Sequence, residues 1–134
     1  MVKILHAADF HLDSPFAGLT SEQARARRRE GRENIARPAH YANAGHVDLV
    51  LLAGDLFDSG EIYRQTAETL AKALGTVEGR VFIAPGNHDY WDEKGPYAQV
   101  NWPENVHIFK SGALEAVELP ELNCVVHGAA FTAP

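Results

Sequence analysis

Three short polar clusters in the sequence contain side chains that bind divalent metals. The clusters are "ADFH", "GDLFD" and "GNHD", and their candidate ligands are Asp9, His11, Asp55 and Asn87. A mixture of oxygen and imidazole ligands suits manganese, iron or zinc better than calcium or magnesium. Asp55 could bridge two metals. A pair of ions about 3.5–4 Å apart suits phosphoester hydrolysis, because it activates water and stabilises charge on the phosphorus oxygens.

Each cluster directly follows an apolar run, at residues 2–8, 47–54 and 80–86. Near-continuous apolar runs predict strands that are covered on both faces, as in a parallel sheet with helices on each side. Ligands collect at the carboxyl ends of such strands, and neighbouring strands lie about 4.8 Å apart. We therefore expect the three clusters to meet at one rim of the sheet. On an extended segment, the spacing of Asp9 and His11 points both side chains the same way. Gly54 and Gly86 let the backbone turn sharply beside the site.

The segment between the first two runs predicts a helix over residues 21–43. Thr20 stands in capping-box spacing with Gln23, which marks the start of this helix. Pro38 should kink or split it, because proline removes a backbone donor and clashes with the preceding turn. Gly45 is a plausible end.

A second helix is predicted between the second and third runs, with Ile62, Thr66, Leu70 and Leu74 on one face. The alternation of strand and helix predicts an α/β fold with a parallel or mixed sheet flanked by helices. Three further short strands are expected within residues 105–110, 113–120 and 123–131.

Composition narrows the class of protein. The chain has 134 residues, which is one domain or part of one, and its net charge of −6 argues against a general nucleic-acid binder but allows a local basic groove. A single cysteine, Cys124, excludes an intrachain disulfide and favours a reducing compartment. The N-terminus lacks a signal-peptide pattern, and no apolar run approaches the roughly 20 residues that span a bilayer. We therefore expect a cytoplasmic protein without membrane association.

The order D-x-H, G-D-x-x-D and G-N-H-D resembles that of the calcineurin-like metallophosphoesterase superfamily, from His6 to about Phe131. Protein serine/threonine phosphatases of that superfamily carry Arg and Glu where this chain has Ser59 and Asp89. The stretches "HAADFHLDSPF" and "AGDLFD" instead resemble the bacterial DNA-repair exonuclease branch, the SbcD-type nucleases.

The resemblance implies a role for each metal-binding candidate. Asp9 and His11 would hold a first divalent metal, most plausibly Mn²⁺, with Fe²⁺ or Zn²⁺ as alternatives. Asp55 would bridge to a second metal, which Asn87 would also hold. The implied substrate is DNA or another phosphodiester, and the implied partner is an ATPase subunit.

Three further residues receive roles from the same resemblance. His88 would contact the scissile phosphate and assist departure of the leaving oxygen. Asp89 would orient His88, and Asp58 would support the metal ligands from behind. Asp58 and Asp89 are as readily explained as helix-capping residues.

The chain departs from the family pattern after residue 90. The family supplies a lone His and then a G-H-x-H motif, and no G-H-x-H occurs here; His127 in "VVHGAAF" is not assigned as a ligand. We therefore interpret residues 1–134 as the truncated first half of the four-layer metallophosphoesterase fold, with about half of the two-metal ligand set. Such a chain should hydrolyse phosphodiesters poorly by itself and could self-associate through an exposed sheet edge.

Two other interpretations compete with a catalytic one. The chain could be a truncated, non-catalytic module that binds metal or a partner. Separately, four arginines at helical spacing could contact DNA phosphates, but the glutamates between them favour a solvated helix face. These arginines are Arg25, Arg28, Arg29 and Arg32.

Overall fold

The computed structural model describes residues 1–58 and 63–134. Its elements, in chain order, are β1 (Ile4–Ala7), α1 (Ser21–Glu33), α2 (Arg37–Ala44), β2 (Leu49–Leu52), α3 (Arg64–Gly75), β3 (Arg80–Ile83), α4 (Pro96–Gln99), β4 (Val106–Ile108), β5 (Glu115–Leu119), a 3-10 turn (Pro120–Leu122) and β6 (Cys124–Gly128). Ser59 and Ile62, which entered the sequence predictions, lie outside the described residues.

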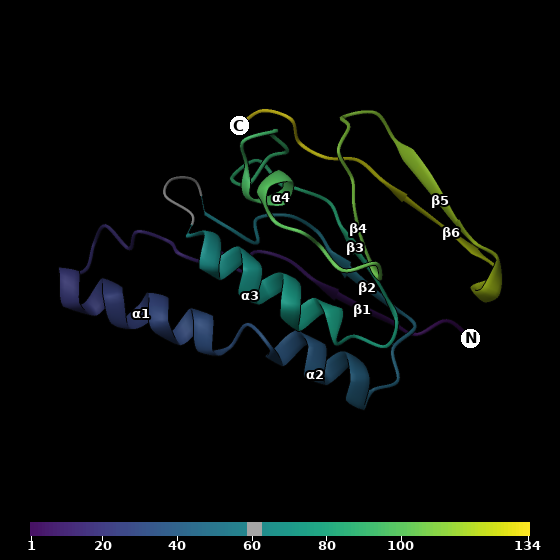
Figure 1. The fold of residues 1–134 in the computed structure, drawn as a ribbon, viewed down its shortest axis with the longest axis horizontal. Helices are drawn as coiled ribbons and strands as arrows, with labels where there is room; N and C mark the ends of the chain where they lie inside the picture. Colours follow the sequence, from purple (N-terminus) through teal and green to yellow (C-terminus); the bar gives the residue numbers. More distant parts are fainter. Residues whose placement is uncertain (59–62) are drawn as a thin grey trace.

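The first four strands form one parallel sheet in the order β1-β2-β3-β4. One row of the register crosses the whole sheet and pairs His6 with Leu51, Leu51 with Phe82, and Phe82 with His107. Because all four strands run the same way, their carboxyl ends lie at one rim (Figure 1). The predicted α/β class is confirmed, and so is the prediction that the first three strands are neighbours.

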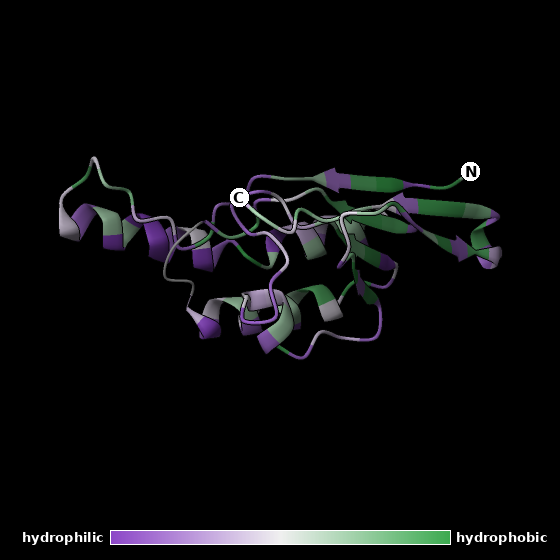
Figure 2. Ribbon diagram, turned by 90° about the horizontal axis from the view of Figure 1, so that it is seen from above, coloured by the Kyte–Doolittle hydropathy of each residue, from purple (hydrophilic) through white to green (hydrophobic). Residues whose placement is uncertain are grey.

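The helices pack on one face of this sheet. Val50 and Val81 from the strands share a buried cluster with Ala39 of α2 and with Leu70 and Leu74 of α3. The strands are largely hydrophobic, whereas α1 carries several hydrophilic stretches and buries only Ala24 (Figure 2). None of the described helices combines the length and the apolar character that crossing a membrane requires.

The opposite face packs against a hairpin rather than against further helices. Strands β5 and β6 pair antiparallel, and they close a second buried cluster with Leu49 and Phe82 of the sheet (Figure 1). Phe109 links the two layers, because its ring stacks on Phe82 at 6.2 Å between centroids. The sheet is thus covered by helices on one face and by a hairpin on the other, since a hairpin with alternating apolar residues also buries an apolar sheet.

The predicted first helix is divided in two, as expected from Pro38. Thr20 forms a full capping box with Gln23, α1 ends at Glu33, and Pro38 occupies the first turn of α2. Proline is tolerated there because the amides of a first turn have no helical acceptor. Gly45 is the C-cap of α2, as predicted.

Replacing Phe109 by Ala should lower the free energy of unfolding by about 3–5 kcal/mol, because it opens a cavity between the sheet and the hairpin. Phe109 is 2% exposed, whereas Phe131 is 57% exposed. Phe131→Ala is therefore the matched control and should cost less than about 0.5 kcal/mol. Urea unfolding measures both; equal losses would show that the hairpin does not depend on this contact.

Candidate metal centre

Three of the predicted metal ligands converge at the rim of the sheet. One ligand atom from each of Asp9, His11 and Asp55 lies within 4.8 Å of the other two. His11 Nε2 lies 3.8 Å from Asp9 Oδ1. Asp9 is exposed, with 70% of its side chain accessible, so the cluster is open to solvent on one side. Two carboxylates and an imidazole in this arrangement match the donor preferences of a divalent metal such as Mn²⁺, Fe²⁺ or Zn²⁺.

The backbone at these three residues is left-handed rather than extended. The φ angles are 58° at Asp9, 44° at His11 and 52° at Asp55. The expectation that Asp9 and His11 align on an extended segment was therefore wrong. Asp and His enter this region at a cost, and residues held there cluster at functional sites.

Hydrogen bonds between neighbouring loops hold this conformation. The Asp9 N–H donates to the Gly54 carbonyl at 3.1 Å, and the His11 N–H donates to the Asp55 carbonyl at 3.0 Å. The loop after β1 thus continues the pairing of the sheet beyond the strands, which sets Asp9 and His11 beside Asp55.

Gly54 and Gly86 bring the loops after β2 and β3 into contact. Gly54 has a φ of 83°, and a Cβ there would lie 2.8 Å from Gly86 Cα. A Cβ on Gly86 would lie 2.3 Å from Asp55 Oδ1. Close approach therefore requires glycine at both positions, and Gly54 is also required by its left-handed φ.

Asp89 is buried at 2% exposure and anchors the loop that carries Asp55. Its carboxylate accepts hydrogen bonds from the backbone N–H groups of Asp55, Leu56, Phe57 and Gly86 and from the Tyr97 hydroxyl. The contacts with Asp55 and Gly86 measure 3.0 and 2.7 Å. Asp89 therefore fixes the loop backbone, and its role in orienting His88 stays a prediction.

Asp58 is the carboxylate that lies beside the histidines. Its Oδ1 is 3.3 Å from His88 Nδ1 and 3.6 Å from His11 Nδ1. The two imidazole rings are 5.3 Å apart and nearly perpendicular. A carboxylate at Nδ1 fixes the ring orientation and leaves Nε2 for a metal or substrate.

His88 and Asn87 belong to the loop after β3. The His88 N–H donates to Asp55 Oδ1 at 3.0 Å, so the third loop is tied to the second at the proposed bridging ligand. Asn87 is exposed between Gly86 and His88. Its role as a ligand stays a prediction.

Two residues that shape the site were not singled out from the sequence. Asp13 buries its side chain to 1% exposure, pairs with Arg32 at 2.8 Å and accepts the Tyr63 N–H at 3.3 Å. Tyr97 is the buried donor to Asp89. The only sequence signal for Asp13 was its position as a second acid, two residues after His11, whereas nothing local distinguishes Tyr97 from an ordinary aromatic residue.

Comparison with known proteins agrees with this geometry. The family model described as "Calcineurin-like phosphoesterase" matches residues 2–131. The chain belongs to this family. It is also 40% identical over 119 residues to the uncharacterized metallophosphoesterase YhaO of Bacillus subtilis (strain 168), in an alignment that covers 83% of this chain and 28% of that protein. Membership makes the chain part of an enzyme family that uses divalent metals for phosphoester hydrolysis.

A divalent metal should stabilise the fold. Asp9 and Asp55 are like charges held close together, and a cation relieves their repulsion. At a Mn²⁺ concentration one hundred times its Kd, the free energy of unfolding should rise by about 2.7 kcal/mol. Thermal melts with Mn²⁺ and with EDTA measure this shift, and identical midpoints would contradict a metal site.

The same melts should show a specific effect of Asp55→Asn. Asn tolerates the left-handed backbone, so the variant should fold, bind Mn²⁺ more weakly and be at least as stable without metal. Glu104→Gln, an exposed carboxylate-to-amide change elsewhere, is the control and should keep the full Mn²⁺ shift.

Tyr97 should make the protein sensitive to alkaline pH. Burial, together with the neighbouring Asp89 carboxylate, raises the pKa of Tyr97 well above its usual 10.0. The unfolded chain then loses this proton at lower pH than the folded one, so stability should fall as the pH rises above about 10, by up to about 1.4 kcal/mol per pH unit. Tyr97→Phe should cost about 1–3 kcal/mol at pH 8 and flatten this loss.

The measurement is urea unfolding between pH 8 and pH 11.5. Tyr41→Phe, at a side chain that is 64% exposed, is the control and should behave as the wild type does. A Tyr97→Phe profile parallel to that of the wild type would assign the alkaline loss to other groups.

Proposed function

We propose that this chain is the metal-binding part of a phosphodiesterase that cleaves DNA, of the SbcD-type exonuclease branch. The observation that supports it most directly is the convergence of Asp9, His11 and Asp55 beside His88 at one rim of the sheet. The branch assignment rests on the stretches around Asp9 and Asp55. A single cysteine fits action in the cytoplasm.

Each residue has a distinct task in this proposal. Asp9, His11 and Asp55 would hold one divalent metal, for which we propose Mn²⁺, and Asn87 would join Asp55 at a second. When bound, the metals would polarise the phosphate and activate the attacking water. His88, with Nδ1 facing Asp58 at 3.3 Å, keeps Nε2 for the substrate and would hand a proton to the leaving oxygen.

The chain covers little more than a quarter of the length of its Bacillus relative, so the activity of a whole protein is a further proposal. We propose that such a protein works with an ATPase subunit. The four proposed ligands would fill fewer than half of the coordination positions of two metals, so both ions would be held loosely. We therefore expect slow turnover by these 134 residues.

The test is Mn²⁺-dependent hydrolysis of bis(p-nitrophenyl) phosphate and of single-stranded DNA by the purified chain. His88→Ala should lower kcat by about 100-fold or more and leave the Mn²⁺ shift of the melting temperature in place, because this residue contributes proton transfer rather than metal binding. His40→Ala, at an exposed position of α2, is the control and should retain full activity.

Two outcomes would contradict the catalytic proposal. Turnover that persists in His88→Ala would show that His88 is not the proton donor to the leaving oxygen. Binding of Mn²⁺ with no turnover on either substrate would favour the alternative, a non-catalytic module that acts through a partner.

A further inference from the structure

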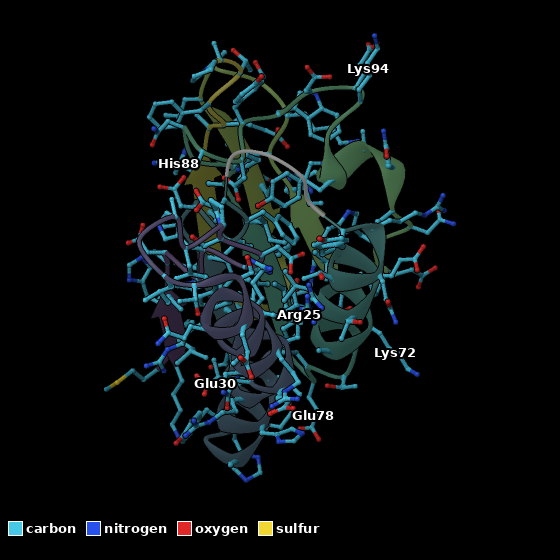
Figure 3. The ribbon with its side chains drawn as sticks, turned by 90° about the vertical axis from the view of Figure 1, so that its left-hand side faces the viewer. Arg25, Glu30, Lys72, Glu78, His88 and Lys94 are labelled. Carbon is cyan, nitrogen blue, oxygen red and sulfur yellow. The ribbon has the colours of Figure 1, made fainter. Side chains whose placement is uncertain are left out.

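A groove between α1 and α3 collects four arginines. Arg25, Arg28 and Arg32 line it from α1, and Arg64 lines it from α3. Its volume is about 630 Å³, and among the described residues that line it none is acidic. The concentration of positive charge is notable in a chain whose net charge is −6. Figure 3, which views the rim of the sheet, shows Arg25 between the two helices.

The structure separates these arginines from the others of α1. Arg27 pairs with Glu30 at 2.9 Å, and Arg29 pairs with Glu33 at 3.7 Å, both along the same helix. These pairs form the solvated helix face that the glutamate spacing favoured, and neither arginine lines the groove. The groove therefore holds a distinct set of positive charges.

Within the groove, two charges lack a carboxylate partner. Arg32 is paired with buried Asp13 at 2.8 Å, and Arg64 is paired with Glu68 at 2.8 Å. The guanidinium of Arg25 makes no ion pair or hydrogen bond with the described residues, and that of Arg28 donates to the neutral carbonyl of Pro15 at 3.3 Å. Arg25 and Arg28 are thus free to pair with an anion.

The groove shares one lining residue with a second cavity, which contains His88. Arg64 also lines this second cavity, of about 360 Å³, together with His88, Lys94 and the acidic Asp89 and Asp92. Arg64 therefore borders both the groove and the cavity that contains His88, the residue that we propose acts on the phosphate.

We propose that the groove between α1 and α3 binds the phosphodiester backbone of a nucleic-acid strand whose reacting phosphate lies at the metal centre. This site deepens the proposed function and rests on it. Arginine pairs with phosphate oxygens through two parallel hydrogen bonds. Arg25 and Arg32 are separated by about 10 Å of helix, which is more than a single phosphate occupies. Phosphate contacts of this kind position a strand without reading its sequence.

The first test is binding of a fluorescein-labelled, single-stranded 16-mer DNA, measured by anisotropy in EDTA so that no hydrolysis occurs. Arg25→Ala/Arg28→Ala should weaken binding about tenfold and reduce the slope of log K against log salt concentration by about 1.4, at about 0.7 per lost phosphate contact. Arg25→Ala alone removes a guanidinium that has no described partner, and should show about half of this change in slope without affecting the fold.

The matched control is Arg27→Ala/Arg29→Ala, which removes the same charge from the same helix and should change the affinity less than twofold. Arg25→Lys/Arg28→Lys should retain the salt slope. Equal weakening by both alanine pairs would overturn the proposal, because it would show a general charge effect. A mononucleotide that binds as tightly as the 16-mer would also overturn it, because one anion would then fill the site.

Failure of this proposal is distinguishable from failure of the proposed function. Bis(p-nitrophenyl) phosphate is too short to extend from the metal centre into the groove, so its hydrolysis should be unchanged in Arg25→Ala/Arg28→Ala. The KM for the 16-mer should rise in the same variant. A chain that binds DNA through these arginines but hydrolyses neither substrate would support the groove and contradict the catalytic proposal.

Discussion

The buried carboxylate of Asp89 is the interaction on which the candidate site depends. Four backbone amides and one phenol point at its two oxygens, from the loop after β2, from Gly86 and from Tyr97. A buried carboxylate is costly unless such donors surround it, and buried amides are costly without an acceptor. Each therefore requires the other, and the loop with Asp55 has one arrangement that satisfies both. The left-handed backbone at Asp55 is held within this network.

Parallel pairing supplies the second constraint. Each strand ends at the same rim, and hydrogen bonds from Asp9 and His11 to the next loop extend the pairing past the strand ends. The loops after β2 and β3 can approach each other because Gly54 and Gly86 have no Cβ, which at either position would collide with the neighbouring loop. The metal-binding side chains thus converge because the backbones beneath them are already in contact. A site formed in this way needs no large movement to bind an ion.

Much of this arrangement could be predicted from the sequence, because its signals are local. Apolar runs marked the strands, Thr20 with Gln23 marked the start of α1, and Asp55 and His88 stood directly after strand ends. The roles of Asp58 and Asp89 could not be separated in this way. Both are acids beside a predicted ligand, and only the packing of three loops decides that Asp58 faces the imidazoles while Asp89 faces the backbone amides. The left-handed conformation of Asp9 and His11 likewise depends on the neighbouring loop.

The same limit applies to the arginines of α1. Helical spacing placed Arg25, Arg28, Arg29 and Arg32 near one another, but it could not say which of them α3 would face. Ion pairs along the helix occupy Arg27 and Arg29. Arg25 and Arg28 instead line a groove with Arg32 of the same helix and Arg64 of α3. Packing against α3 therefore divides the arginines of α1 between two surfaces, an ion-paired face exposed to solvent and a groove with unpaired positive charge.

The separation of Asp55 and Asp89 in the chain sets an order of events during synthesis. The loop amide at position 55 and its acceptor at position 89 are 34 positions apart in the chain. At a translation rate of about 5–20 residues per second, the ribosome delivers Asp89 about 2–7 s after Asp55. Until then the amides of residues 55–57 have only water as an acceptor. The contacts that fix the backbone around Asp55 can consequently form only after β1, β2 and β3 have all been synthesised, and a nascent chain that stalls before Asp89 would hold Asp55 through the loop after β1 alone.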